Sequence, residues 1–86
     1  MRDIRRICEA VGKYHGVPTH WFMNERRSKT RTRCRRLSMA LTREMTGMSY
    51  PEIAEQFGYV PSNCINAYKE LKNEKDFNEI KERLER

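Results

Sequence analysis

The sequence predicts an all-α fold, a compact helical domain that contains a helix-turn-helix. Apolar residues recur at three- and four-residue spacing, glycines and capping residues divide this pattern into short segments, and two of the segments are joined by a connection of only a few residues. The 86 residues suffice for one modest core. We therefore expect a single domain over residues 1–86.

The first helix is expected over residues 3–14, because its apolar positions share one helical face and Gly16 supplies a natural end. Residues 17–23 are too few for a long helix. They predict one or two helical turns that place Trp21 and Phe22 in the core.

The next segment, residues 24–31, contains no apolar residue and is therefore expected to be a basic surface loop. Thr32 then caps a second long helix that continues to Thr46. Its buried stripe is predicted to consist of Leu37, Ala40, Leu41 and Met45. The basic side chains predicted to avoid that stripe are Arg33, Arg35, Arg36 and Arg43. They gather towards the helix start, where the helix dipole disfavours cations and a bound anion relieves the conflict.

A third helix begins at a capping box formed by Ser49 and Glu52, and Gly58 ends it. A fourth helix follows after a short connection, and we expect Ser62 or Asn63 to cap it. Its predicted buried face is Ile65, Tyr68 and Leu71. Two short helices joined by a glycine-containing turn are typical of a helix-turn-helix.

The C-terminal segment has a second pattern of the capping-box kind, with Asp76 and Glu79 three residues apart. Its apolar stripe is Phe77, Ile80 and Leu84. Either a separate helix begins here or the preceding helix continues. Residues 69–86 have no net charge, so we expect this end to cover the core or to pair with a partner helix.

The net charge of +6 is concentrated in one segment. Residues 24–43 hold eight basic side chains against Glu25 alone, whereas residues 44–86 carry more acidic than basic side chains. Such a concentration is expected where phosphates are neutralised. The alternative is a solvated arginine-rich loop that binds RNA, an acidic protein or nothing, although RNA binding lacks an exposed aromatic platform.

Several function classes lack their residues. No nucleophile, acid–base pair or glycine-rich phosphate loop has supporting spacing, so we expect no enzyme. Three cysteines (Cys8, Cys34, Cys64) and two histidines (His15, His20) are too scattered for a metal site, and we expect reduced thiols and no cofactor. No apolar run approaches the length of a membrane span, which favours a cytoplasmic protein without a membrane partner.

In a helix-turn-helix, the first residues of the second helix enter the major groove of DNA. Here those residues are Ser62, Asn63 and Asn66, with Lys69 further along, and Asn66 is the main candidate to read adenine. In the basic segment, we expect Arg27 or Lys29 to reach a minor groove, and other arginines to hold phosphates. The full predicted set is Arg26, Arg27, Lys29, Arg31, Arg35, Arg36, Arg43, Ser62, Asn63, Asn66 and Lys69.

Two stretches, Arg26-Arg27-Ser28-Lys29 and Met39 to Gly58, resemble the C-terminal DNA-binding domain (domain IV) of the bacterial replication initiator DnaA family. The resemblance covers residues 3 to about 72. It implies a Trp-repressor-like fold whose helix-turn-helix enters the major groove of a short origin box while the basic loop enters the minor groove. The family's nucleotide-binding motor domain has no counterpart in these residues.

Carried over by position, Arg27 resembles the family's minor-groove arginine. Arg35, Arg36 and Arg43 fall where the family places backbone and base contacts, with Arg36 in place of a usual glutamine. The turn departs from the family pattern: residues 59–64 replace Gly-Arg-Asp-His-Thr-Thr, so the usual base-reading side chains are absent. We expect orientation and nonspecific affinity to survive, while recognition of the ordinary initiator box is left open.

The resulting hypothesis is sequence-specific binding of double-stranded DNA. A helix near 62–75 lies in the major groove, and a basic loop over 24–36 lies on the minor groove and phosphates. We expect a monomer or weak dimer in the bacterial cytosol or nucleoid, acting in replication initiation and origin binding, either excised from a longer protein or encoded alone by a phage or mobile element. The alternative is a protein-interaction adaptor or small transcription regulator that has lost initiator-box specificity, with a partner at the C-terminal helix.

Overall fold

The computed structural model describes residues 2–23 and 28–86, and every regular element in this part of the chain is an α-helix. The helices are α1 (Arg2–His15), α2 (Thr19–Met23), α3 (Lys29–Thr46), α4 (Tyr50–Phe57), α5 (Pro61–Leu71) and α6 (Lys75–Glu85). The predicted all-α fold is confirmed, and α5 and α6 are separate helices. None of the described helices combines the length and the apolar character needed to cross a membrane.

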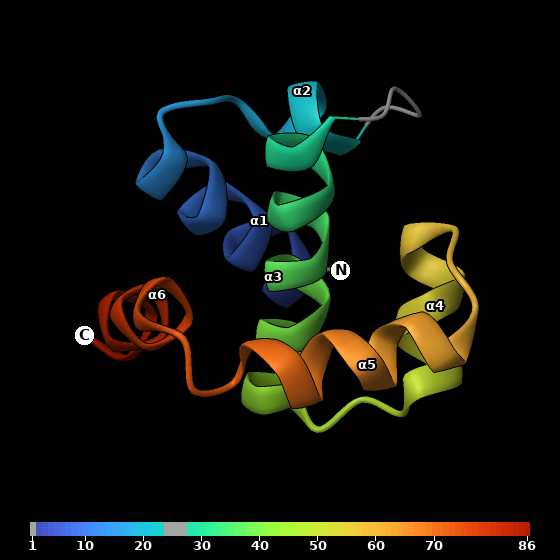
Figure 1. Ribbon diagram of the computed structural model, residues 1–86. Coiled ribbons are helices and arrows are strands. Elements are labelled where there is room, and N and C mark those ends of the chain that lie inside the picture. Colours follow the sequence, from blue (N-terminus) through green and yellow to red (C-terminus); the bar gives the residue numbers. More distant parts are fainter. Residues whose placement is uncertain (1, 24–27) are drawn as a thin grey trace.

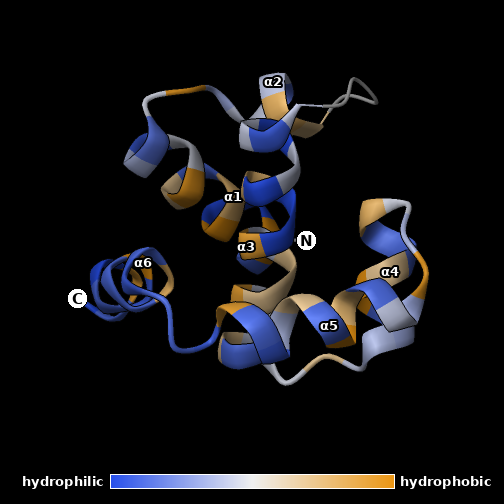
Figure 2. Ribbon diagram, in the orientation of Figure 1, coloured by the Kyte–Doolittle hydropathy of each residue, from blue (hydrophilic) through white to orange (hydrophobic). Residues whose placement is uncertain are grey.

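The central element is α3, against which each of the other described helices packs. Figure 1 shows α1 and α6 on one side of α3, α4 on the other, and α5 across its C-terminal half. Leu37, Ala40 and Leu41 of α3 are fully buried, as predicted, whereas Met45, the fourth residue of the predicted stripe, is only half-buried. The N-terminal half of α3 is hydrophilic, and the half that α5 crosses is more apolar (Figure 2). The basic end of α3 therefore projects beyond the contact with α5.

α3 begins four residues earlier than predicted, with Ser28 in place of Thr32 as the residue before its first turn. Ser28 is its N-cap, and the Ser28 side-chain oxygen accepts a hydrogen bond from the backbone N–H of Arg31 at 3.1 Å. The prediction that Thr32 caps this helix is therefore wrong, because a serine with the same capping chemistry precedes it. Of the predicted loop over 24–31, Lys29 to Arg31 are helical, and residues 24–27 lie outside the described residues.

The helix-turn-helix consists of α4 and α5. Ser49 and Glu52 form the predicted capping box at the start of α4. Gly58 ends α4 with a left-handed backbone (φ 70°), and its N–H donates to the carbonyl of Ala54. Because residues other than glycine rarely adopt this backbone conformation, Gly58 allows the chain to leave α4 abruptly.

The start of α5 differs from the prediction that Ser62 or Asn63 caps it. Val60 is the N-cap, no side chain caps the helix, and Pro61 occupies the first turn. Proline suits this position because it has a fixed φ and no N–H that would need a partner. Ser62 and Asn63 therefore lie within the first turn, with exposed side chains.

The buried face of α5 is also shifted from the predicted one. The side chains of Cys64, Ala67 and Leu71 are buried, whereas Ile65 and Tyr68 are only half-buried. Cysteine and alanine allow α5 to approach α3 closely.

α6 covers the core through Phe77, Ile80 and Leu84, all at most 7% exposed. The predicted second capping box is wrong. Glu74 is the N-cap of α6 without a side-chain hydrogen bond, so Asp76 lies inside the first turn, where it pairs with Arg33 of α3. A long-range ion pair has thus taken the carboxylate that local spacing assigned to capping.

Candidate nucleic-acid interface

One edge of α5 carries four polar side chains that point away from the core. Ser62, Asn63, Asn66 and Lys69 are exposed, while the opposite face of α5 is buried. We call these four residues the α5 edge. Within the described part of the chain, no hydrogen bond or ion pair engages their side chains. The α5 edge therefore presents donors and acceptors that folding leaves available to a ligand.

The turn that leads into α5 is fastened to the body of the protein by Arg35. Its guanidinium donates to the Tyr59 hydroxyl at 2.7 Å and to the Phe22 carbonyl at 2.7 Å. Arg35 is only 7% exposed, so the prediction that it avoids the buried face of α3 is wrong. A buried guanidinium is tolerated when its donors are satisfied, and here it joins α2, α3 and the turn.

Arg31 and Lys29 differ although both lie in the first turns of α3. The Arg31 guanidinium lies over the Trp21 ring, 4.2 Å from its centroid, and its Nε donates to the Trp21 carbonyl at 3.0 Å. This contact shields the ring of Trp21, which is half-buried against the core. Lys29 is exposed and remains accessible to an anion.

Two further arginines of α3 already have protein partners. Arg36 donates to Glu70 of α5 at 2.9 Å. Arg43 donates to the Met48 carbonyl at 2.7 Å, and its guanidinium lies 4.7 Å from the centroid of the Tyr50 ring. A phosphate contact by either arginine would have to share or replace these interactions.

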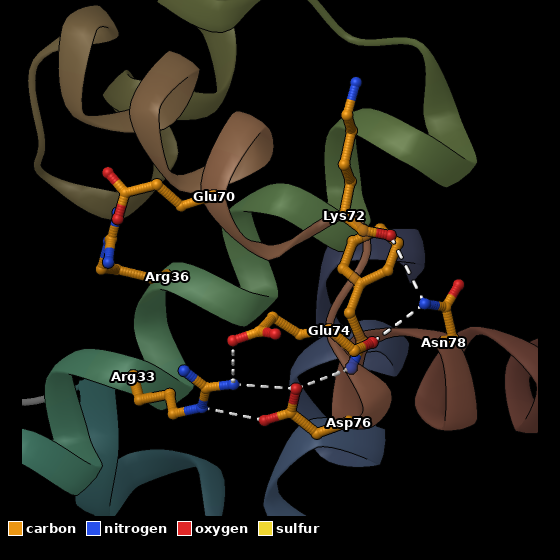
Figure 3. A network of polar contacts seen from close by, with 8 residues as sticks. Arg33, Arg36, Glu70, Lys72, Glu74, Asp76 and Asn78 are labelled. Carbon is orange, nitrogen blue, oxygen red and sulfur yellow. Dashed lines mark hydrogen bonds and ion pairs between the residues drawn. The ribbon is translucent and has the colours of Figure 1, made fainter.

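Arg33, which was not among the predicted site residues, forms a bidentate ion pair near the start of α3. Its Nε and one terminal nitrogen donate to the two carboxylate oxygens of Asp76, each at 2.9 Å, and Glu74 lies 3.7 Å away (Figure 3). Burial acts to raise the pKa of Asp76, but the hydrogen bonds and charge of Arg33 outweigh it and hold that pKa below its ordinary value. Because the partners are 43 residues apart, local spacing could not reveal the pair.

A shallow hollow at the N-terminal end of α3 is bordered by Ser28, Lys29, Thr32, Arg33 and Arg36. Two of its three basic residues are held by carboxylates, so Lys29 is the basic residue in the hollow without such a partner among the described residues. The positive end of the α3 dipole adds to the attraction for a phosphate here.

The cysteines and acidic residues show no arrangement for metal binding. Cys8, Cys34 and Cys64 are free and buried, and burial raises the pKa of each thiol. In residues 2–23 and 28–86, no three His, Cys, Asp or Glu side chains gather closely enough to hold a metal ion.

The structure therefore divides the predicted site. It brings the α5 edge together on one helix and places Lys29 at the start of α3, whereas Arg31, Arg35, Arg36 and Arg43 contact other parts of the protein. Arg26 and Arg27 lie outside the described residues.

The helix-turn-helix of α4 and α5 has a counterpart among known proteins. A family model described as the bacterial DnaA protein helix-turn-helix matches residues 4–71. The chain belongs to this family. Membership in the DnaA helix-turn-helix family supports binding of DNA, and the match ends with α5, so α6 lies beyond it.

Individual relatives agree with this assignment. The chromosomal replication initiator protein DnaA of Thermoanaerobacter sp. (strain X514) is 35% identical over 71 residues, which cover 83% of this chain. The protein of the same name from Streptococcus mutans serotype c is also 35% identical over 71 residues, covering 81% of this chain. The aligned part amounts to 16% of the length of each relative. The similarity to DnaA thus concerns one small portion of those longer proteins.

Proposed function

We propose that this chain binds double-stranded DNA in a sequence-specific manner, with the N-terminal part of α5 in the major groove. The observation that carries the proposal is the α5 edge, whose polar side chains have no partners among the described residues although they occupy the element that reads bases in helix-turn-helix proteins. The Asn66 amide can donate to and accept from one adenine edge. Lys69, one turn further along α5, is placed in this proposal to contact a phosphate of the DNA backbone.

The basic segment supplies the second contact. Lys29 at the start of α3, together with Arg26 and Arg27 in the sequence before it, neutralises phosphates or enters the adjacent minor groove. Arg35 acts in this proposal as a positioning residue, because its guanidinium donates to Tyr59 and Phe22. Arg31, Arg36 and Arg43 contribute mainly through the positive field around α3.

The curated relatives are replication initiators, and we propose a related role for this chain at an origin-like sequence. The adaptor alternative loses its expected surface: Phe77, Ile80 and Leu84 were the residues expected to meet a protein partner, and they are buried in the core. The exposed remainder of α6 is predominantly charged.

Selection of bound duplexes from a random DNA pool tests the proposal. The best binder is then titrated at two salt concentrations against a scrambled duplex and an initiator box. We expect one compact motif to be bound at least about a hundredfold more tightly than the scrambled duplex, because specific DNA-binding domains prefer their sites to nonspecific DNA by a large factor. Equal, weak binding to every duplex would overturn sequence specificity.

A double variant tests the basic segment. Arg27→Ala with Lys29→Ala should flatten the plot of log affinity against log salt by about two units, because each phosphate contact contributes about 0.9. The matched control is Lys13→Ala with Lys75→Ala, which removes two positive charges from exposed positions on α1 and α6. An equal change in both double variants would show that only net charge matters.

A further inference from the structure

Val60 is the most exposed large hydrophobic side chain in the described part of the protein, at 55%. A single exposed apolar residue is ordinary on a protein surface, so exposure alone carries no meaning. Its position is informative, because Val60 is the N-cap of α5 and immediately precedes the exposed residues of the α5 edge.

The backbone on both sides of Val60 is fixed, which holds its side chain outward. On one side, the Tyr59 N–H donates to the Ala54 carbonyl at 2.9 Å and the Tyr59 hydroxyl accepts from Arg35. On the other side, Pro61 restricts the chain to helix-compatible angles. Val60 itself has an extended backbone (φ −95°, ψ 153°), and its carbonyl accepts from the Asn63 N–H at 3.0 Å. The isopropyl group is thus presented by a rigid turn.

In a helix-turn-helix, the start of the second helix faces the base edges in the major groove. Most groups on those edges are polar, and the C5-methyl group of thymine is the apolar feature among them. An isopropyl group held against an amine or carbonyl of another base would desolvate that group without offering a hydrogen bond.

We propose that Val60 contacts the C5-methyl group of a thymine and makes thymine the preferred base at that position. This inference rests on the proposed function and adds a specificity determinant to it. The contact is apolar, so it discriminates thymine from cytosine by the methyl group and by the cost of covering the cytosine amine. It complements the α5 edge, whose asparagines supply hydrogen bonds.

Single replacement of thymine by uracil, as a deoxyuridine nucleotide (called deoxyuracil below), tests the contact, because uracil lacks only the C5-methyl group. Each thymine of the best selected duplex is replaced in turn, and affinity is measured by competition for a labelled duplex. We expect one replacement to weaken binding about fourfold, which is the effect of removing one buried methyl group. In Val60→Ala, the same replacement should cause almost no further loss, so the two changes are not additive.

Val60→Thr provides a second variant that keeps the branched shape and replaces a methyl group with a hydroxyl. It should reduce the preference for thymine over cytosine at the same position while leaving the thermal transition unchanged. The matched control, Lys75→Ala, alters an exposed residue on α6 and should retain the full fourfold effect of deoxyuracil.

Three results would overturn the inference. The first is that no single deoxyuracil weakens binding, and the second is that Val60→Ala weakens thymine and deoxyuracil duplexes equally. The third is that Val60→Ala leaves both affinities unchanged. Each differs from failure of the proposed function, in which the unmodified protein binds no duplex above the scramble.

Discussion

Two regions of the molecule, the contact of α6 with α1 and α3 and the exposed edge of α5, hold their polar side chains in opposite ways. On the side covered by α6, ionisable groups from different helices are paired: Arg33 with Asp76, Lys81 with Glu44, and Tyr14 with Glu79. We call these six residues the α6 face. On the α5 edge, Ser62, Asn63, Asn66 and Lys69 have no such partners among the described residues. Polar groups on the α6 face join helices together, whereas those on the α5 edge remain available for binding.

The difference also separates cations with similar sequence surroundings. Arg33 and Lys29 lie one turn apart on α3, yet Arg33 is held by two carboxylates and Lys29 is exposed. We call the hydrogen bonds of Arg35 to Tyr59 and Phe22 the Arg35 clamp. The comparison predicts that substitutions on the α6 face and in the Arg35 clamp change stability. Substitutions on the α5 edge should change DNA binding alone.

The largest expected effect comes from breaking the Arg35 clamp, which holds the turn before α5 against α2 and α3. Arg35→Ala removes the donors to Tyr59 and Phe22 and takes this partner away from the buried Phe22 carbonyl and the half-buried Tyr59 hydroxyl. We expect a loss of about 3 kcal/mol in the free energy of unfolding, measured by urea denaturation. Arg35→Lys keeps the charge but cannot make both bonds in the same geometry, so its loss should be smaller. An unchanged urea midpoint in Arg35→Ala would show that the clamp contributes nothing.

A smaller loss of stability is expected on the α6 face. Asp76→Asn removes the charge that pairs with Arg33, and we expect a loss of about 2 kcal/mol at neutral pH. Duplex affinity should not fall when measured where the variant is folded. A loss of affinity as large as that of an α5-edge variant would remove the distinction between the two regions.

The same pair predicts how stability depends on pH. The pKa of Asp76 and that of Glu44 are both below their ordinary values in the folded protein; for Glu44 the hydrogen bonds from Lys81 and Tyr68 lower it. A lowered pKa stabilises the fold above the unfolded value, and this contribution is lost as the pH falls through the folded value. Stability should therefore decline below about pH 4. Asp76→Asn should show a shallower decline in this range by urea denaturation, and an identical slope would contradict the assignment.

Much of the fold was predictable because its determinants are local. The apolar stripe of α3, the Ser49–Glu52 capping box and the glycine that ends α4 all depend on residues within a few positions of one another. The start of α3 shows where local sequence is insufficient. Ser28 and Thr32 both have the hydroxyl that an N-cap requires, and only the surrounding structure selects Ser28. The likeness to the Trp repressor fold and the single domain over 1–86 stay predictions.

The candidate site was less predictable, because its arginines look alike in the sequence. Arg35 is buried beneath the turn and Arg36, the next residue, lies in a surface ion pair, although both were expected to hold phosphates. Their difference depends on Tyr59 and Glu70, more than 20 residues away. Conversely, nothing in the sequence indicated that Val60 is exposed at the start of α5, because a valine beside a proline is typical of an ordinary turn.

On the α5 edge, the expected effect is confined to binding. Asn66→Ala should weaken binding to the best duplex by about 1 to 3 kcal/mol and relax the preference at one base pair, with the urea midpoint unchanged. Asn73→Ala is the matched control, because Asn73 is also an exposed asparagine but lies in the connection between α5 and α6. If Asn66→Ala weakened binding equally on every duplex, the residue would support binding without reading a base.

The smallest effect distinguishes two exposed lysines. Lys69→Ala on the α5 edge should reduce the slope of log affinity against log salt by about 0.9, the contribution of one phosphate contact. Lys75→Ala on α6 removes the same charge from an exposed position, but it should leave that slope nearly unchanged. Both slopes are obtained from duplex titrations at several salt concentrations. Because the variants have the same net charge, a difference between them can arise only from where the charge lies. Equal slopes would mean that α5 and α6 contribute alike to the electrostatic attraction, and that the α5 edge is not the side of the molecule facing DNA.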